Sequence, residues 1–331
     1  MKYPEGTAEY EFRKTAQKYG ASILFELFNY ICVATGIGFV VAVISYVLTG
    51  SESIDYKTDL GYAAMMILND IYSYAAPALV FFLMFRNELK ETRFIPAYPK
   101  IPGELILLFF TGGSLARWGS VITNYIAEYL NAVFNIPEPQ AAFSSSGPQN
   151  TIQFLIFSFF VVFTGPIFEE LIYRHLLLKP LRKYGDVTAA VMSSLIFGLS
   201  HFNFDQFLYT FIFGFSLAVI AIRRGSVIPA MVVHIINNAI ATLSVYLPET
   251  FGNAVVDGMF ASLADILNFL GIIVLFGGLA AVVIAAVLHI FDLWQPIRIP
   301  TQTQLKILFT SPLVIIGIIG SLAMAFLLLY V

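Results

Sequence analysis

Polar side chains that can do chemistry lie inside three apolar segments of this 331-residue chain. The first segment carries two carboxylates and a guanidinium, the second ends in an imidazole, and the third carries an imidazole and an amide. A charged group at the middle of a membrane helix costs about 2.5–3.5 kcal/mol or more, so each of these residues needs a reason. Together with one aromatic neighbour they are Glu169, Glu170, Arg174, Phe197, His201, His234 and Asn238.

Spacing within the first segment separates the two carboxylates. Glu169 and Glu170 are adjacent, so on a helix they point about 100° apart and cannot share one role. Glu170 and Arg174 are four residues apart, which predicts an ion pair on the helix surface. Glu169 is left on a different face, without a local partner.

The other two segments repeat the four-residue spacing. Phe197 and His201 share one helix face, and so do His234 and Asn238. Counting inward from the expected cytoplasmic helix ends places Glu169 about 15 Å and His201 about 21 Å deep. The same count places His234 about 12 Å and Asn238 about 18 Å deep. A lone buried histidine is usually structural, but four such groups at similar depth on three helices favour a functional site.

Composition shows which elements must position these residues. The chain is 58% hydrophobic and only 12% charged, with one cysteine and a formal net charge of −3; its mean hydropathy is +0.81. Soluble domains are about 45–50% apolar and about 25% charged, so a soluble enzyme is excluded. A disordered chain and a disulfide scaffold are excluded too, and no basic surface for nucleic acid is present. The apolar runs are continuous and not alternating, which predicts an all-α polytopic membrane protein.

Apolar runs near the roughly 20 residues that a bilayer requires give eight to nine transmembrane helices, nine by direct count. Nearly all of the 18 Lys and Arg residues fall in alternate loops between these runs. The positive-inside rule then predicts a multi-pass protein of the cell membrane with a cytoplasmic N-terminus. The expected spans are 23–48, 63–85, 104–134, 151–178, 188–202, 206–222, 226–246, 266–290 and 307–331.

The same pattern divides the chain into four parts. Residues 1–22 are expected to be a cytoplasmic N-terminal segment, in which Glu9–Lys18 forms either a helix on the membrane surface or a solvated tail. Residues 23–150 are N-terminal transmembrane helices, residues 151–246 a catalytic core, and residues 247–331 C-terminal transmembrane helices.

Three chemistries use the set of polar residues. In the first, Glu169, assisted by His201, takes a proton from a water that attacks a peptide carbonyl, since burial makes a carboxylate a stronger base near neutral pH. His234 and Asn238 then donate hydrogen bonds to the oxyanion. The second is a zinc site made of two histidines and a glutamate. The third is a proton- or ion-coupled transporter with the glutamate as carrier.

Two observations weaken the last two alternatives. The usual zinc-protease pattern, with two histidines flanking a glutamate on one helix, is absent from the sequence. Matching pairs of short, glycine-interrupted half-helices, which are typical of transporters, are absent as well.

The patterns Glu-Glu-x-x-x-Arg, Phe-x-x-x-His and His-x-x-x-Asn, in this order on successive helices, resemble the CPBP family. That family contains the type II CAAX prenyl endopeptidases and the bacteriocin-processing or immunity proteins of the Abi type. The resemblance covers about residues 150–245 and implies an intramembrane glutamic endopeptidase. It assigns activation of the water to Glu169 and His201, and the oxyanion hole to His234 and Asn238.

The resemblance also implies roles for the remaining residues. Glu170 and Arg174 form a supporting pair, and Phe197 is a packing or substrate-wall residue. No cofactor is expected, and the partner is a membrane-associated peptide or protein in the lipid bilayer, prenylated in one branch of the family. The alternative is a non-catalytic bacteriocin-immunity or membrane binding protein that keeps the polar cluster as structure.

One more ion pair is expected outside the cluster. Arg117 and Asp70 lie at matching distances, about 10 Å, from the outer membrane surface. Matching depth predicts a buried structural ion pair between them. The alternative is a cavity lined by Arg117 that receives a substrate carboxylate.

Overall fold

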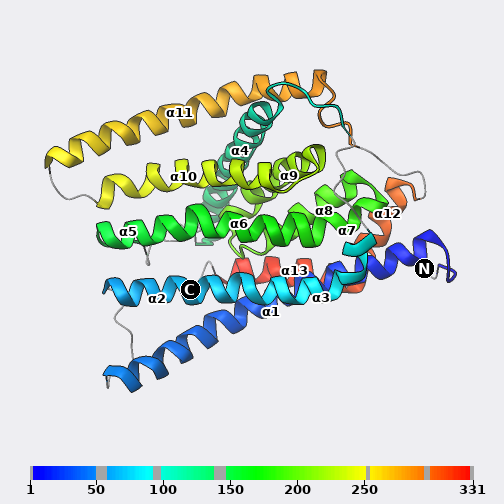
Figure 1. The fold of residues 1–331 in the computed structure, drawn as a ribbon, viewed down its shortest axis with the longest axis horizontal. Coiled ribbons are helices and arrows are strands. Elements are labelled where there is room, and N and C mark those ends of the chain that lie inside the picture. Colours follow the sequence, from blue (N-terminus) through cyan, green and yellow to red (C-terminus); the bar gives the residue numbers. More distant parts are fainter. Residues whose placement is uncertain are drawn as a thin grey trace.

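The computed structural model describes residues 3–49, 58–91, 98–137, 147–250, 254–293 and 299–328, and these residues form helices and connecting turns without a strand. Long helices lie side by side along the longest axis of the molecule, with α4 crossing them obliquely (Figure 1). The prediction of an all-α membrane protein is confirmed.

The N-terminal half contains three long helical runs. Helix α1 extends over Ala8–Thr49. The second run joins α2 (Asp59–Asp70), the π-helical segment η1 (Ile71–Ala75) and α3 (Ala76–Glu91). Helix α4 (Glu104–Phe134) is the third.

The next run changes its hydrogen-bond register several times. It consists of α5 (Thr151–Ser158), the π-helix η2 (Phe159–Thr164), α6 (Gly165–Glu169), the π-helix η3 (Glu170–Leu178), α7 (Lys179–Leu181) and the 3-10 turn η4 (Arg182–Tyr184). Pro166 has no N–H to donate to the carbonyl four residues earlier, and the register changes immediately before it. π-helical segments are rare and are frequently found at functional sites.

The remaining helices complete the bundle. They are α8 (Asp186–Leu199), α9 (Phe204–Arg224), α10 (Ile228–Thr250), α11 (Ala254–Val287), α12 (Thr301–Phe309) and α13 (Pro312–Leu327).

Four helical runs within the described residues are long and apolar enough to cross a membrane. A fifth is formed if α12 and α13, which meet at 66°, are taken as one broken span. The expected span 188–202 corresponds to α8, an apolar helix of 14 residues that is shorter than these runs. Residues 329–331 of the last expected span lie outside the described part of the chain. The four runs are Asp59–Lys90, Glu104–Phe134, Thr151–Tyr184 and Gln206–Arg224.

The N-terminal segment is part of the first helix, so Glu9–Lys18 is helical and the alternative of a solvated tail is wrong. Phe12, Ala16 and Tyr19 are fully buried, and the ring of Phe12 packs edge-on against Tyr184 at 4.7 Å between centroids. Apolar residues at these spacings form one helix stripe, and that stripe packs on the protein core. Lys14, which lies between them, is exposed and pairs with Glu11 at 3.4 Å.

Helix α9 forms the centre of the core. Its residues from Leu217 to Ile222 are fully buried, and it packs between α4 and α8. Its C-terminal end is tied to the start of α4, where the Glu104 carboxylate pairs with Arg223 and, at 3.1 Å, with Arg224. This buried pairing joins the C-terminal end of α9 to the N-terminal end of α4.

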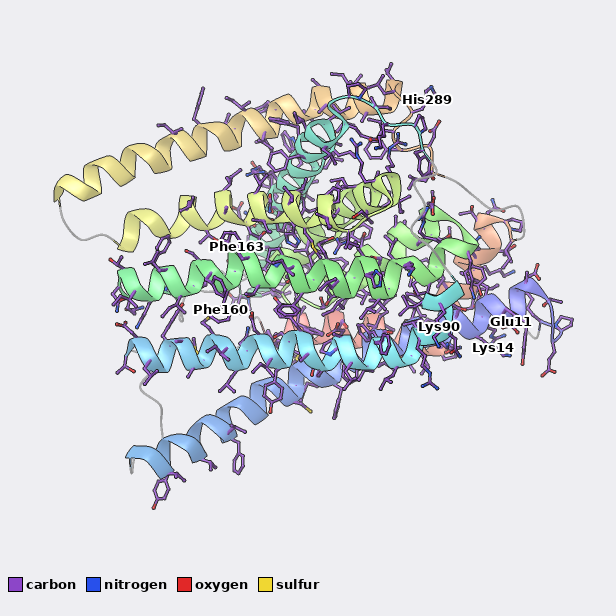
Figure 2. All side chains as sticks on the ribbon, in the orientation of Figure 1. Glu11, Lys14, Lys90, Phe160, Phe163 and His289 are labelled. Atoms are coloured by element: carbon purple, nitrogen blue, oxygen red, sulfur yellow. The ribbon has the colours of Figure 1, made fainter. Side chains whose placement is uncertain are left out.

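Charged residues gather at one end of the bundle. Figure 2 shows Lys14 and Lys90 at the end that holds the N-terminus, with His289 near the corresponding end of α11. Phe160 and Phe163 lie farther along the bundle. This separation agrees with a bundle whose apolar middle faces lipid.

Candidate active site

Helix α10 brings His234 between the two adjacent glutamates. Oε1 of Glu170 lies 3.0 Å from Nδ1 of His234, and Oε2 of Glu169 lies 3.5 Å from Nε2. A neutral imidazole carries one proton, so His234 can donate to both carboxylates only as an imidazolium with a proton on each nitrogen.

The two glutamates differ in access. The Glu170 side chain is completely buried, whereas 17% of the Glu169 side chain is exposed. Glu169 is therefore the carboxylate that water or a substrate can reach. Its partner comes from a neighbouring helix, α10, which supplies His234.

Arg174 balances the buried charge. Its Nη1 lies 3.2 Å from Oε1 of Glu170, so the predicted ion pair is present, and its Nη2 donates to the carbonyl of Gly214 at 2.9 Å. The guanidinium lies 4.6 Å from the centroid of the Phe197 ring. A cation over an aromatic face is attracted by the ring quadrupole, so the Phe197 ring adds a stabilising contact to Arg174 beside its ion pair with Glu170.

Phe197 also contacts both imidazoles. Its ring packs edge-on against His201 at 4.9 Å and against His234 at 5.9 Å. Nδ1 of His201 lies 2.8 Å from the carbonyl of Phe197 and must donate to it. The neutral ring of His201 therefore keeps its lone pair on Nε2, which can accept a proton.

Asn238 lies on the same helix as His234 and faces η2. Its amide donates to the carbonyl of Val161 at 3.1 Å, which uses one of its two amide hydrogens. The next residue back, Asn237, donates to the hydroxyl of Tyr209 at 2.9 Å. Thus the structure brings Glu169, Glu170, Arg174, Phe197, His201 and His234 into one connected cluster, with Asn238 on the adjoining turn of α10.

Two tyrosines near the cluster were not predicted from the sequence. Tyr74 of η1 donates to Oε1 of Glu169 at 3.2 Å. The hydroxyl of Tyr173 lies 3.1 Å from Oε1 of Glu26 in α1 and 2.8 Å from Oγ of Ser200. Tyr173 lies inside the Glu-Glu-x-x-x-Arg pattern, which is a local signal. Tyr74 has no such signal, because nothing in the sequence pairs its segment with Glu169.

The expected ion pair between Asp70 and Arg117 is wrong. Oδ2 of Asp70 accepts a hydrogen bond from Thr164 at 2.5 Å, and Arg117 donates to the carbonyl of Gly113 at 3.3 Å. Two residues at equal depth can form an ion pair only if their helices are neighbours. Helix α2 packs against α5, whereas α4 packs against α9 and α11.

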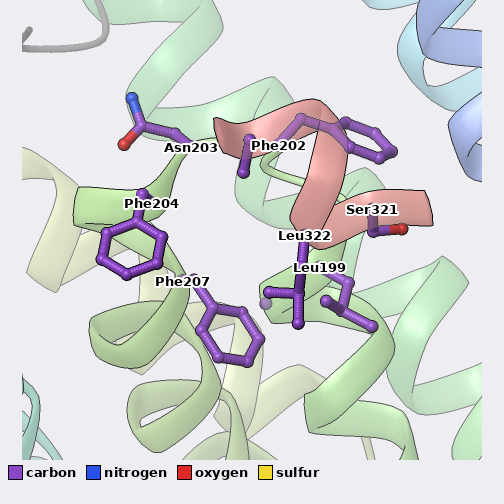
Figure 3. Close-up of a pocket in the computed structure, with 9 residues that line it drawn as sticks. Leu199, Phe202, Asn203, Phe204, Phe207, Ser321 and Leu322 are labelled. Atoms are coloured by element: carbon purple, nitrogen blue, oxygen red, sulfur yellow. The ribbon is translucent and has the colours of Figure 1, made fainter. Parts of the chain in front are cut away.

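A small, partly open cavity lies beside the loop that carries His201. Figure 3 shows Leu322 of α13 meeting Phe207 of α9 and Leu199 of α8 around it. Its nine lining residues do not include Glu169 or His234. The cavity is mostly apolar, with Ser321 and Asn203 as its polar members.

The arrangement of acidic and histidine side chains bears on metal ligation. In the part of the chain that the structure describes, no three His, Cys, Asp or Glu residues are grouped as ligands of a single metal ion. Both ring nitrogens of His234 face carboxylates, as given above.

Comparison with protein-family models matches residues 151–240 to the type II CAAX prenyl endopeptidase Rce1-like family. The matched stretch runs from α5 into α10 and includes every residue of the cluster and Asn238. Comparisons with curated proteins and with solved structures found no match. Residues 151–240 are thus an Rce1-like domain of the CAAX protease family.

Proposed function

We propose that this protein is an intramembrane endopeptidase in which Glu169 activates the attacking water. One observation carries the proposal: Glu169 is the accessible carboxylate, and it faces Nε2 of a buried imidazole at 3.5 Å. Membership of residues 151–240 in a protease family supports hydrolysis of a peptide bond. Catalytic roles for the individual residues follow from their contacts.

The first step requires a base beside a bound water. Glu169 accepts one proton from the water, and the free Nε2 of His201 accepts a hydrogen bond from the other. His201 is oriented for this by its Nδ1–H, which donates to the carbonyl of Phe197. The water oxygen then bonds to the peptide carbonyl carbon, and negative charge develops on the carbonyl oxygen.

The second step requires donors for that charge. His234 provides Nε2–H as an imidazolium, whose Nδ1–H donates to Glu170 from the buried side. Asn238 provides the amide hydrogen that does not bond to Val161. A preorganised donor of this kind is worth about 10²–10³ in rate. The tetrahedral intermediate collapses when the C–N bond breaks, and the proton held by Glu169 passes to the leaving amine.

Glu170 and Arg174 act through His234 and do not touch the substrate in this scheme. Their buried pair fixes Nδ1–H and the orientation of the ring, and the carboxylate of Glu170 stabilises the imidazolium. The reaction as written needs no metal ion.

The proposed substrate is a membrane-associated peptide. In the simplest case it is a prenylated CAAX protein that loses its C-terminal tripeptide, a proposal supported by the match to the type II CAAX prenyl endopeptidase family. We further propose nine spans in the cell membrane with the N-terminus in the cytoplasm, from the alternation of basic loops.

The test is cleavage of a farnesylated CAAX peptide by detergent-purified protein, run beside the same peptide without the farnesyl group. Wild type should release the tripeptide, and Glu169→Ala should not, while both proteins show the same size-exclusion profile. Cleavage of both peptides at equal rates would retain the protease but remove the prenyl requirement. A well-folded wild type that cleaves neither would contradict the proposal and favour a non-catalytic binding or immunity protein.

A further inference from the structure

A residue outside the Rce1-like domain completes the contacts of Glu169. Tyr74 lies in η1, well before residues 151–240, and donates its hydroxyl proton to Oε1 of Glu169 at 3.2 Å. The other carboxylate oxygen, Oε2, faces Nε2 of His234 at 3.5 Å. Each oxygen of Glu169 therefore has its own partner, and the two partners come from different helices.

Packing around Tyr74 holds the hydroxyl in place. Its ring stacks on Phe168, with centroids 5.6 Å apart and an interplanar angle of 14°. Gly165 leaves room for the hydroxyl, because a Cβ at that position would lie 3.2 Å from Oη of Tyr74. One turn earlier, Asp70 accepts a hydrogen bond from Thr164 at 2.5 Å. The helical run α2–η1–α3 is thus joined to the run that carries Glu169 at two successive turns.

We propose that Tyr74 is a positioning residue for Glu169. The N-terminal helices then fix part of the catalytic geometry of the Rce1-like domain. The catalytic consequence rests on the proposed function. A carboxylate with one oxygen fixed keeps its other oxygen directed at the water and at His234, and small misplacements of a reacting group are costly in rate. A hydrogen-bond donor also stabilises the ionised form of the carboxylate.

Other groups set the charge around Glu169, so the effect of Tyr74 must be measured against them. These groups interact electrostatically with Glu169 and come from several elements. They are Asp70 of α2, Tyr173 and Arg174 of η3, His201 of the turn after α8, Tyr209 of α9 and His234 of α10. Replacing Tyr74 by Phe removes one donor and leaves all of these in place.

The activity test compares Tyr74→Phe with Tyr72→Phe. Tyr72 lies in the same π segment, two residues away, and the substitution is chemically identical. Tyr74→Phe should lower kcat about tenfold with little change in KM, because it removes one hydrogen bond to a charged group. The acid limb of the kcat profile should move to higher pH, because the carboxylate loses a donor that favours its ionised form. Tyr72→Phe should leave both unchanged.

A second variant moves the hydroxyl without altering Tyr74. Gly165→Ala places a methyl group against Oη of Tyr74 and should shift the acid limb in the same direction. If Glu169→Gln abolishes cleavage but Tyr74→Phe keeps the wild-type kcat and pH profile, the inference is overturned and the proposed function stands.

An infrared titration tests the contact without a substrate. The carboxyl band of Glu169, isolated by subtracting the spectrum of Glu169→Gln, should titrate at higher pH in Tyr74→Phe than in wild type. An unchanged midpoint would overturn the inference even if no peptide is cleaved. A shifted midpoint together with an inactive wild type would support the contact and reject the proposed function.

Discussion

Glu169 and Glu170, adjacent in the chain, face opposite nitrogens of one imidazole, that of His234. The register change from α6 to the π-helix η3 falls between these two residues. One carboxylate is wholly buried beside Arg174, and the other is partly exposed. Two identical side chains thereby acquire different environments, which is how one site can obtain a structural carboxylate and a reactive one.

The first prediction concerns the buried ion pair. Arg174→Met should lower the free energy of unfolding by about 3–5 kcal/mol, because it leaves the charge of Glu170 buried and unpaired. Lys14→Met is the control, since Lys14 pairs with Glu11 on the exposed surface and should show no measurable change. Denaturant unfolding in detergent measures both. Equal stabilities of the two variants would contradict the assignment of Arg174.

The second prediction concerns the close approach at Gly214. A Cβ there would lie 2.8 Å from Cδ1 of Phe197 and 3.0 Å from Nη2 of Arg174. Gly214→Ala should therefore displace both side chains, cost about 1–3 kcal/mol and reduce cleavage. Gly277→Ala makes the same change where the nearest atom is 3.9 Å away, and it should be neutral in both assays. Loss of activity in both variants would mean that helix flexibility, and not this contact, matters.

The third prediction follows from the separate partners of Asp70 and Arg117. The effects of Asp70→Asn and Arg117→Gln on the free energy of unfolding should add in the double variant, as they do for residues that share no partner. Thermal unfolding of the two single variants and the double variant measures this. Recovery of stability in the double variant would contradict this prediction and support an ion pair between Asp70 and Arg117.

The all-helical class and the Glu170–Arg174 pair were predictable because both depend on short-range spacing. Continuous apolar runs exclude strands in any membrane protein of this kind. A separation of four residues predicts a contact on any helix, whichever way the helix packs.

The lateral arrangement of helices was not predictable in the same way. Depth along the membrane normal can be counted from a sequence, but which helices are neighbours cannot. That is why Asp70 was assigned to Arg117 and why the Tyr74 contact was missed. The burial of Phe12 and Tyr19 was missed for a related reason: a helix with charges on one face looks the same whether its other face meets lipid or protein.

The fourth prediction concerns metal. Treatment with a zinc chelator, followed by its removal, should leave the rate of peptide cleavage unchanged, and added zinc should not raise it. The expectation rests on a hydrolytic scheme in which side chains alone activate the water and stabilise the oxyanion. Inactivation by the chelator with recovery on zinc addition would instead favour a site built from His201, His234 and Glu169.

The most direct test of the division between the two glutamates compares Glu169→Gln with Glu170→Gln, measuring cleavage and thermal unfolding on the same preparations. Glu169→Gln should lose cleavage by about 10²-fold or more and keep the wild-type unfolding temperature, because the amide keeps the shape and an acceptor for Tyr74. Glu170→Gln should lower the unfolding temperature, because it removes the buried partner of Arg174. Substantial cleavage by a stable Glu169→Gln would contradict the account.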